Sequence, residues 1–323
     1  MKKRSIALLL LLVLLTGCGA KTEEAPWQTA YRETGKYLQE QDTLSAGSVG
    51  GEWAVIGLSR AGLLSDKAAQ SYEITAEDYV KQADSGRLDR SKSTENSRTI
   101  LGLTAAGYDA SNVAGVDLTS GLSDMNYLRI QGLNGPIWAL IALDCHSYDI
   151  PQCAEGGEQT TREGLVAEIL TSQCSDGGWT LAGDTADVDM TAMALTALAP
   201  YKDDAEVKAA VDAALTYLSD AQQADGGFMS WGAANSESCA QVIVALTALG
   251  IDPTSDERFI KEGGTVLDAL CAFACEGGGF RHSSDQAEPD GMATEQGFYA
   301  LVAYDRFRQG QTRLFDMTDI KVK

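Results

Sequence analysis

Cationic residues and histidines are scarce in this sequence, and both shortages exclude classes of function. The 323 residues include 25 Lys and Arg against 46 Asp and Glu, which gives a formal net charge of −21 at pH 7. A chain this negative repels the phosphate backbone, which argues against nucleic acid as a partner. The histidines are His146 and His282 alone, and a catalytic zinc needs three protein ligands. We therefore expect no metal or other cofactor, and we look to carboxylates and aromatic rings for the chemistry.

Long apolar runs are absent too, apart from one near the N-terminus. Ile6 to Leu15 is unbroken apolar sequence that follows a basic start and leads into Leu-Thr-Gly-Cys at Cys18. This run is too short to cross a bilayer, which takes about twenty residues. The pattern resembles bacterial lipoprotein signals, which implies cleavage before Cys18 and a lipid on its sulfur. Residues 1–17 are then the signal peptide and 18–26 a tether, and the lipid holds the protein on the extracytoplasmic face of the cell membrane.

Six cysteines follow Cys18, and an exported protein can oxidise them. They stand at positions 145, 153, 174, 239, 271 and 275. Their spacing dictates no framework. Cys145 and Cys153, on either side of a short loop, are the most plausible pair, and the pairing stays open.

Similar hexapeptides recur six times along the chain. They are GLSRAG from Gly57, GLTAAG from Gly102, ALIALD from Ala139, ALTALA from Ala194, ALTALG from Ala245 and ALVAYD from Ala300, at spacings of 45, 37, 55, 51 and 55 residues. Each ends a stretch that is apolar nearly all round, as a helix enclosed by its neighbours should be. Between them lie amphipathic stretches, such as residues 161–173 and 206–222. Alternating buried and half-exposed helices predict a chain of helical hairpins.

Helical hairpins at this period build either an open solenoid or a closed ring. Six repeats without polar capping repeats at the ends favour the ring. We predict an all-α fold, an α6/α6 toroid with six inner and six outer helices, in a single domain over residues 27–323. The repeat is faintest over residues 65–120.

Glycine pairs mark three of the predicted turns from an outer to an inner helix. The stretches are QCSDGGW from Gln173, QQADGGF from Gln222 and CEGGGF from Cys275. Paired glycines end a helix and turn the chain sharply, and the aromatic residue anchors the turn. The structural turns are assigned to Gly177, Gly178 and Trp179, to Gly226, Gly227 and Phe228, and to Gly278, Gly279 and Phe280. The first two stretches match the Gln-x3-Gly-Gly-aromatic pattern of triterpene cyclases, and the third has Ala274 in place of Gln. Residues 160–305 thus resemble the terpenoid cyclase and protein prenyltransferase superfamily of α/α toroids, known for its prenyltransferase and squalene oxidase repeats.

Carboxylates recur near the start of the predicted inner helices. The candidates for the rim of a central pocket are Asp187, Asp189, Glu237, Glu295 and Glu52, with the aromatic residues Trp53, Trp231, Phe298 and Tyr299 beside them. Acidic side chains at helix N-termini also serve as caps and interact favourably with the helix dipole. Both interpretations stay open for each carboxylate.

The resemblance suggests an acid catalyst at one of these positions. Class II terpene cyclases carry Asp-x-Asp-Asp-Thr-Ala with a proton-donating middle Asp, which Asp189 matches. Met190 stands in place of the last Asp of that motif. An alkene requires a very strong acid, so the lost carboxylate weakens the case for this chemistry. A calcium ion could bind to Asp184, Asp187 and Asp189, but the sequence around them lacks the glycine-centred loop of the usual calcium site.

The sequence can also be compared with two other groups of α/α toroids. Protein prenyltransferase β subunits bind zinc through an Asp-x-Cys pair and a later His. Glu237 and Cys239 lie in the region of that pair, but the last inner helix has no His. The helical domain of vitamin B12 transport proteins such as intrinsic factor has similar repeats and binds its ligand without converting it.

Acidic α/α barrels also include glycoside hydrolases. These enzymes work with two carboxylates about 5 to 10 Å apart across a sugar. Asp189 and Glu295 could form such a pair, and Trp53, Trp138, Trp179 and Trp231 could stack on sugar rings.

The sequence therefore favours a lipid-anchored extracytoplasmic toroid that binds a small molecule or a cell-surface partner at the rim of its central pocket, without catalysis. The alternatives are a terpenoid cyclase-like or prenyltransferase-like enzyme that uses Asp189 as general acid and, more weakly, a glycan-active enzyme. A large apolar cavity would favour the cyclase, and a shallow polar one would favour binding at the rim.

Overall fold

The computed structural model describes residues 24–41, 44–47, 49–83, 86–230 and 232–323. This part of the chain is predominantly helical, which confirms the predicted all-α class. The expected signal peptide, Cys18 and Trp231 lie outside the described residues. Within the described ranges, no helix has the length and apolar character needed to cross a membrane.

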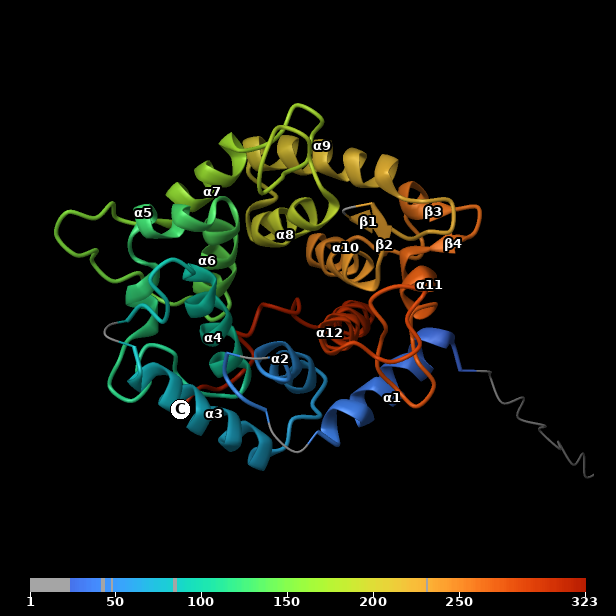
Figure 1. The fold of residues 1–323 in the computed structure, drawn as a ribbon. Coiled ribbons are helices and arrows are strands. Elements are labelled where there is room, and N and C mark those ends of the chain that lie inside the picture. The colour runs from blue at the N-terminus through green and yellow to red at the C-terminus, as the bar shows by residue number, and fades with distance from the viewer. Residues whose placement is uncertain (1–23, 42–43, 48, 84–85, 231) are drawn as a thin grey trace, which may run out of the picture.

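Six helices form an inner layer, visible at the centre of Figure 1. They are α2 (Glu52–Arg60), α4 (Ser93–Ala105), α6 (Asn134–Asp144), α8 (Val188–Leu198), α10 (Ser236–Leu249) and α12 (Gly291–Arg308). Each contacts the next one along the chain, and α12 contacts α2. Every one of them contains at least the start of a predicted hexapeptide repeat, so the repeats do mark the buried helices.

The outer helices vary much more in length than the repeat suggests. They are α1 (Pro26–Gln39), α3 (Asp66–Lys81), α5 (Met125–Leu128), α7 (Arg162–Thr171), α9 (Ala205–Ala221) and α11 (Val266–Cys271), with 3-10 turns η1 (Leu118–Leu122), η2 (Arg129–Gln131), η3 (Ala199–Tyr201) and η4 (Glu257–Phe259). Helix α5 spans one turn because the chain passes into η2 and then into Gly132 at φ 58°. The outer layer is therefore thinnest beside α6.

Two short antiparallel hairpins lie outside the helices. They are β1 (Met229–Ser230) with β2 (Ala233–Ala234) and β3 (Ile260–Lys261) with β4 (Gly264–Thr265). The first lies in the loop from the second glycine turn to α10, and the second leads into α11.

The glycine turns join each hairpin to the next. Gly177 has φ 96°, and a Cβ there would lie 2.9 Å from the carbonyl oxygen of Ala213 in α9. Gly226 has φ 89°, and its Cβ would lie 2.5 Å from the carbonyl oxygen of Thr265. Both positions therefore need glycine for its left-handed backbone and for the close approach of a neighbouring chain segment.

Glutamine side chains complete these junctions. Gln173 Nε2 donates to the carbonyl oxygens of Gly177 and Ala210, at 2.7 and 2.9 Å. Gln222 Nε2 donates in the same way to Gly226 and Phe259, at 2.8 and 3.1 Å. The third junction, which lacks the glutamine, instead has the hydroxyl of Thr34 accepting from the Gly279 N–H at 3.0 Å. The turn aromatics Trp179, Phe228 and Phe280 are fully buried beneath the turns.

The C-terminal segment, residues 309–323, crosses the end of the inner layer where the inner helices finish. Asp319 binds Arg60 of α2 at 2.6 Å and Arg306 of α12 at 2.9 Å. The N–H of Met317 donates to the carbonyl oxygen of Cys145 at 2.7 Å, which ties the segment to the end of α6. We call this end of the layer the far end, and the end where the inner helices begin the rim.

The cysteines of the described part are all free, Cys145 and Cys153 included. Cys145 is buried, and its Sγ lies 3.8 Å from the hydroxyl of Thr104. Burial raises the pKa of the Cys145 thiol to about 12. It behaves here as a small core residue.

Candidate functional site

Asp187 is the N-cap of α8. Its side chain accepts from the Met190 N–H at 2.8 Å, and its own N–H donates to the carbonyl oxygen of Trp179 at 2.9 Å. Burial raises the pKa of Asp187, and the Met190 N–H opposes that shift. The capping interpretation therefore describes this residue.

Asp189 lies two residues further on, in the first turn of α8, and does not cap the helix. It is half-buried, and its Oδ1 has no hydrogen-bond partner within the described part of the chain. A buried carboxylate oxygen without a partner is costly. Asp189 is thus the carboxylate of α8 that is available to a ligand.

Glu52 and Glu295 lie behind the segment that leads into α2. Glu52 pairs with Arg98 of α4 at 3.0 Å and accepts from the Gly47 N–H at 3.0 Å. Glu295 of α12 accepts from the Gly50 N–H, and its second oxygen has no partner among the residues described. Burial raises the pKa of Glu52, with Arg98 opposing, and raises the pKa of Glu295 to about 7. Glu295 is therefore largely protonated at weakly acidic pH, which suits a proton donor.

Glu237, in the first turn of α10, makes a contact that the sequence did not reveal. His282, in the loop before α12, has its Nδ1 2.8 Å from the carboxylate, and Ser236 donates to it at 3.1 Å. Cys239 on the same helix is buried and lies apart from this pair in the core. The described ranges hold no cluster of three His, Cys, Asp or Glu side chains suited to a metal ion.

Tyr299 of α12 lies among the carboxylates of the rim. Its hydroxyl accepts from Gln241 Nε2 at 2.8 Å. Burial raises the pKa of Tyr299 far above its usual value, and the charges of Glu237, Glu295 and Asp189 raise it further. The negative charges of three predicted carboxylates, on α8, α10 and α12, therefore all act on this hydroxyl.

Four aromatic rings divide the interior of the inner layer, and we call them the aromatic partition. Trp53 contacts Trp138 with ring centroids 5.1 Å apart, and it contacts Tyr299 at 6.1 Å. Phe315 of the C-terminal segment contacts the same two partners, Trp138 at 5.9 Å and Tyr299 at 6.3 Å. The contacts form a closed cycle across α2, α6, α12 and the C-terminal segment. The rings fill the space that an open central channel would need.

A pocket of about 140 Å³ lies on the rim side of this partition. It is lined by Trp53, Thr94, Arg98, Asn134 and Trp138, all from the first half of an inner helix. The Asn134 Oδ1 has no hydrogen-bond partner within the described residues. This rim pocket therefore combines two indole rings with an amide and a guanidinium that can bind hydroxyl groups.

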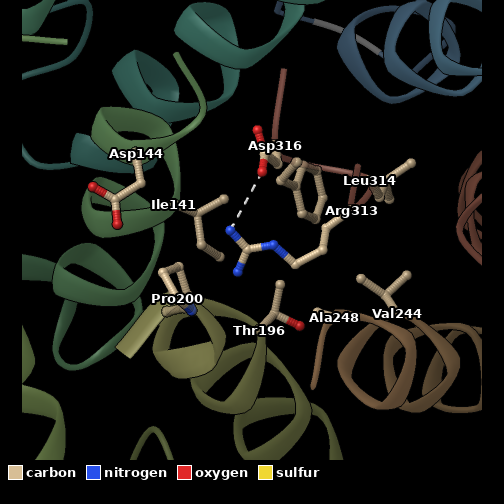
Figure 2. Close-up of a pocket in the computed structure, with 11 residues that line it drawn as sticks. Ile141, Asp144, Thr196, Pro200, Val244, Ala248, Arg313, Leu314 and Asp316 are labelled. Carbon is tan, nitrogen blue, oxygen red and sulfur yellow. Dashed lines mark ion pairs between the residues drawn. The ribbon is translucent and has the colours of Figure 1, made fainter. Parts of the chain in front are cut away.

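A second pocket lies on the far side and is nearly filled. Its free space is about 30 Å³, and Figure 2 shows the side chains around it. Ile141 and Thr196 come from the last turns of α6 and α8, and Val244 comes from the turn before the last of α10. Arg313 and Asp316 come from the C-terminal segment. The Arg313 guanidinium points across the opening and pairs with Asp316 at 3.6 Å.

The remaining predicted aromatic residues do not join the rim pocket. Phe298 is fully buried, and its ring centroid lies 5.6 Å from that of Tyr31 in α1, so it packs between α12 and the outer layer. Trp179 is fully buried as well, and its Nε1 donates to the carbonyl oxygen of Ile169 at 2.7 Å. Each of these rings therefore packs in the core.

Sequence reasoning missed several residues of the site. Arg98, Gln241 and Phe315 carry no motif, because each acts through contacts between distant segments. Asn134 was not missed, because the aligned hexapeptides place it at the same level as Asp189 and Glu295.

Comparison with known proteins identifies the fold. No family model matches the chain, and no curated protein matches it. Among solved structures, the unsaturated glucuronyl hydrolase of Bacillus sp. GL1, described as responsible for glycosaminoglycan degradation, superposes on 90% of this chain and 98% of its own, with a TM-score of 0.55 and 13% identity. The ent-copalyl diphosphate synthase of Streptomyces platensis matches 78% of this chain and 49% of its own, with a TM-score of 0.46 and 18% identity. The protein has the fold of the α/α toroids.

Proposed function

We propose that this protein is a glycan-active enzyme whose rim pocket holds one sugar ring. The observation that carries the proposal is the pocket itself, where Trp53 and Trp138 lie beside Arg98 and Asn134. A sugar ring offers apolar C–H faces to the indoles and hydroxyls to the amide and the guanidinium. The unpartnered Oδ1 of Asn134 supplies an acceptor that a hydroxyl would satisfy.

Glu295 is the proposed proton donor. Glycosidases need one carboxylic acid that is protonated at working pH and a second, ionised carboxylate. Burial raises the pKa of Glu295 to about 7, which meets the first need. Asp189 is the proposed second carboxylate, because its Oδ1 lacks a partner in the described part of the chain. The glucuronyl hydrolase supports the proposal only by showing that an α/α toroid can host sugar chemistry, since fold alone does not fix function.

The small size of the pockets inside the inner layer weighs against the isoprenoid cyclase. The volumes on the two sides of the partition are about 140 and 30 Å³, whereas sites for drug-sized ligands span about 300 to 1,000 Å³. Asp189 keeps the cyclase as the second candidate, because it matches the family's acid and has a free buried oxygen. A rim binder without catalysis is the third.

We infer that the six hairpins close into an α6/α6 ring, which the contact between α2 and α12 supports. We also infer export and lipid attachment at Cys18, which rests on the sequence pattern of residues 1–18. Cys18→Ala should then carry no fatty acid label in its host, and a labelled variant would contradict the anchor.

The test of the function is a panel of 4-nitrophenyl glycosides. Wild-type protein should release nitrophenolate from at least one of them. Glu295→Gln should lose at least about a hundredfold in kcat with little change in binding, because glutamine cannot donate the proton. Trp53→Ala should instead lose binding, and Trp27→Ala on α1, a tryptophan remote from the pocket that packs on Tyr304, is the matched control. Binding of a glycoside without turnover by wild type would leave a rim binder and overturn the catalytic proposal.

A further inference from the structure

Arg98 is the source of positive charge in the rim pocket. Among the described residues that line this pocket, Arg98 alone carries a charge. The other lining residues are Trp53, Thr94, Asn134 and Trp138. Whether the pocket attracts an anionic ligand therefore depends on what the Arg98 guanidinium already contacts.

Two carboxylates bind that guanidinium. Arg98 Nε lies 3.0 Å from the carboxylate of Glu52, and Nη2 lies 2.8 Å from that of Glu95. The side chain of Glu52 is completely buried, and those of Arg98 and Glu95 are 23% and 18% exposed, so water screens the pairs only in part. Tyr79 of α3 donates to Glu95 at 3.1 Å and holds this carboxylate in place. Even when Glu52 takes up a proton, Glu95 still balances the charge of Arg98.

The start of α4 does not add a positive site to the pocket. A helix N-terminus attracts anions through its free N–H groups. Here the Thr94 N–H donates to Gln131 Oε1 at 2.8 Å, and the Glu95 N–H donates to the carbonyl oxygen of Lys92 at 3.1 Å. Lys92 is the N-cap residue, and its exposed side chain does not line the pocket. The described lining thus gives an incoming carboxylate no free partner charge.

Neutral hydroxyl groups, in contrast, find partners in the same pocket. A guanidinium has five N–H donors, which is more than Glu52 and Glu95 engage through Nε and Nη2. The Asn134 Oδ1 has no hydrogen-bond partner in the described part of the chain and can accept from a hydroxyl. A neutral sugar therefore gains hydrogen bonds here without bringing an unbalanced charge.

We propose that the rim pocket selects neutral sugars and excludes uronic acids, because Glu52 and Glu95 neutralise Arg98. The proposal rests on the proposed function, since it takes the rim pocket as the sugar site. Moving a carboxylate out of water without a partner charge is costly. The two carboxylates already at the guanidinium also repel a third one. Glu95 acts through Arg98 and does not contact the sugar itself.

Matched neutral and acidic ligands test this selectivity. Titration calorimetry at about pH 7.5, where a uronic acid is ionised, compares methyl β-D-glucopyranoside with methyl β-D-glucuronide, and the galactoside with the galacturonide. Wild type should bind the neutral member of at least one pair at least about tenfold more tightly. Added salt should not weaken any binding of the acidic member, because no free cation attracts it. Equal or tighter binding of the acidic member, or a loss of its binding in salt, would overturn the proposal.

Glu95→Gln tests the cause, because it removes a balancing charge and keeps the shape of the side chain. The affinity for the acidic ligand should rise at least about tenfold relative to the neutral one. Glu77→Gln is the matched control, since Glu77 pairs with Lys81 on the outer helix α3 and its loss changes the net charge equally. The control should keep the wild-type ratio. An unchanged ratio in Glu95→Gln would overturn the proposed cause, and if this variant does not fold, the wild-type ratio and its salt dependence decide.

The failure of this proposal and that of the proposed function are distinguishable. Tighter binding of a uronide by wild type overturns the selectivity and leaves the sugar site standing. If wild type binds none of these glycosides, the result counts against the proposed function, and fluorescence quenching of the half-buried Trp53 then tests the pocket charge. The Trp53 signal is the difference between proteins with and without Trp53→Phe. Iodide should quench it more in Glu95→Gln than in wild type, whereas neutral acrylamide should quench both alike. Equal iodide quenching in both proteins would overturn the neutralisation of Arg98.

Discussion

Arg98 Nε lies 3.0 Å from the carboxylate of Glu52, and the Glu52 side chain is completely buried. Arg98 also binds Glu95 at 2.8 Å on its own helix, so one guanidinium joins α2 to α4 at the edge of the rim pocket. The pair is therefore structural as well as part of the proposed site.

Removal of Arg98 should destabilise the fold. Arg98→Met leaves a buried carboxylate without its partner, and breaking such a pair costs about 3 to 5 kcal/mol. Because Arg98 is partly exposed and Glu52 can take up a proton, we expect a loss near 2 kcal/mol in chemical denaturation at pH 7. The double variant Glu52→Gln, Arg98→Met should recover part of that loss. Equal stability of wild type and Arg98→Met would mean that the pair contributes little.

Glu295 should make stability depend on pH. Burial raises its pKa to about 7 in the folded protein, from the 4.5 that is usual for a glutamate exposed to solvent. The folded state thus holds a proton that the unfolded state has released, so stability is highest below about pH 4.5 and falls as the pH rises towards 7. The full difference corresponds to about 3 kcal/mol. Glu295→Gln, which keeps an oxygen to accept from Gly50, should lose this pH dependence and be the more stable protein at pH 8. Parallel pH profiles of wild type and variant would show that Glu295 titrates normally.

The glycine junctions should not tolerate a β-branched side chain. Gly177→Val and Gly226→Val each force a left-handed backbone on valine and place Cβ against a carbonyl oxygen of the next segment. We expect each to lose more than about 1 kcal/mol of stability. Gly183→Val is a useful comparison, because that glycine has φ 91° but nothing within 4 Å of its Cβ position. The difference between it and the junction variants in thermal denaturation isolates the cost of the close contact. Unchanged melting temperatures at both junctions would refute the assignment.

Substitution of Asp187 and substitution of Asp189 should have different effects on stability and activity. Asp187→Ala removes an N-cap and should cost about 1 kcal/mol. Asp189 does not cap α8, so Asp189→Asn should change stability by less than about 1 kcal/mol. This substitution removes only the interaction of the carboxylate charge with the helix dipole. Under the proposed function, Asp189→Asn should also lower glycoside turnover.

Incubation of wild type and Asp189→Asn with squalene and with shorter prenyl diphosphates tests the alternative function, an isoprenoid cyclase. A cyclised product from wild type that disappears in Asp189→Asn would establish the cyclase instead.

The inner layer could be predicted from the sequence because its signal is local. A helix enclosed by neighbours needs small apolar residues on every face, and the hexapeptides record that need directly. The glycine turns could be predicted as well, since positive φ at Gly177 and Gly226 restricts those positions to one residue type. The outer helices were predicted less well. Helix α5 is a single turn, since the chain passes directly into η2 and then into Gly132, and the helical periodicity of the sequence did not show that end.

The site could be predicted only in part. Asp187 and Asp189 were both recognised as rim residues, but a cap and an unpartnered carboxylate differ by the direction of one side chain. Arg98 and Phe315 contact partners about 45 and 180 residues away in the chain, and no short motif indicates such a pairing. The packing of Phe315 from the C-terminal segment against Trp138 and Tyr299 could not be predicted for the same reason.

The ion pairs of Asp319 affect how the protein unfolds. A stack of helical repeats that touch only their neighbours can fray from either end, one unit at a time. Here one carboxylate near the C-terminus holds the first and the last inner helix together, through Arg60 and Arg306. Neither terminal helix can leave without breaking contacts to the opposite end of the chain. The first and last inner helices are therefore joined by the same contacts to Asp319. Loss of these contacts should release the first and last hairpins together as a single cooperative unit.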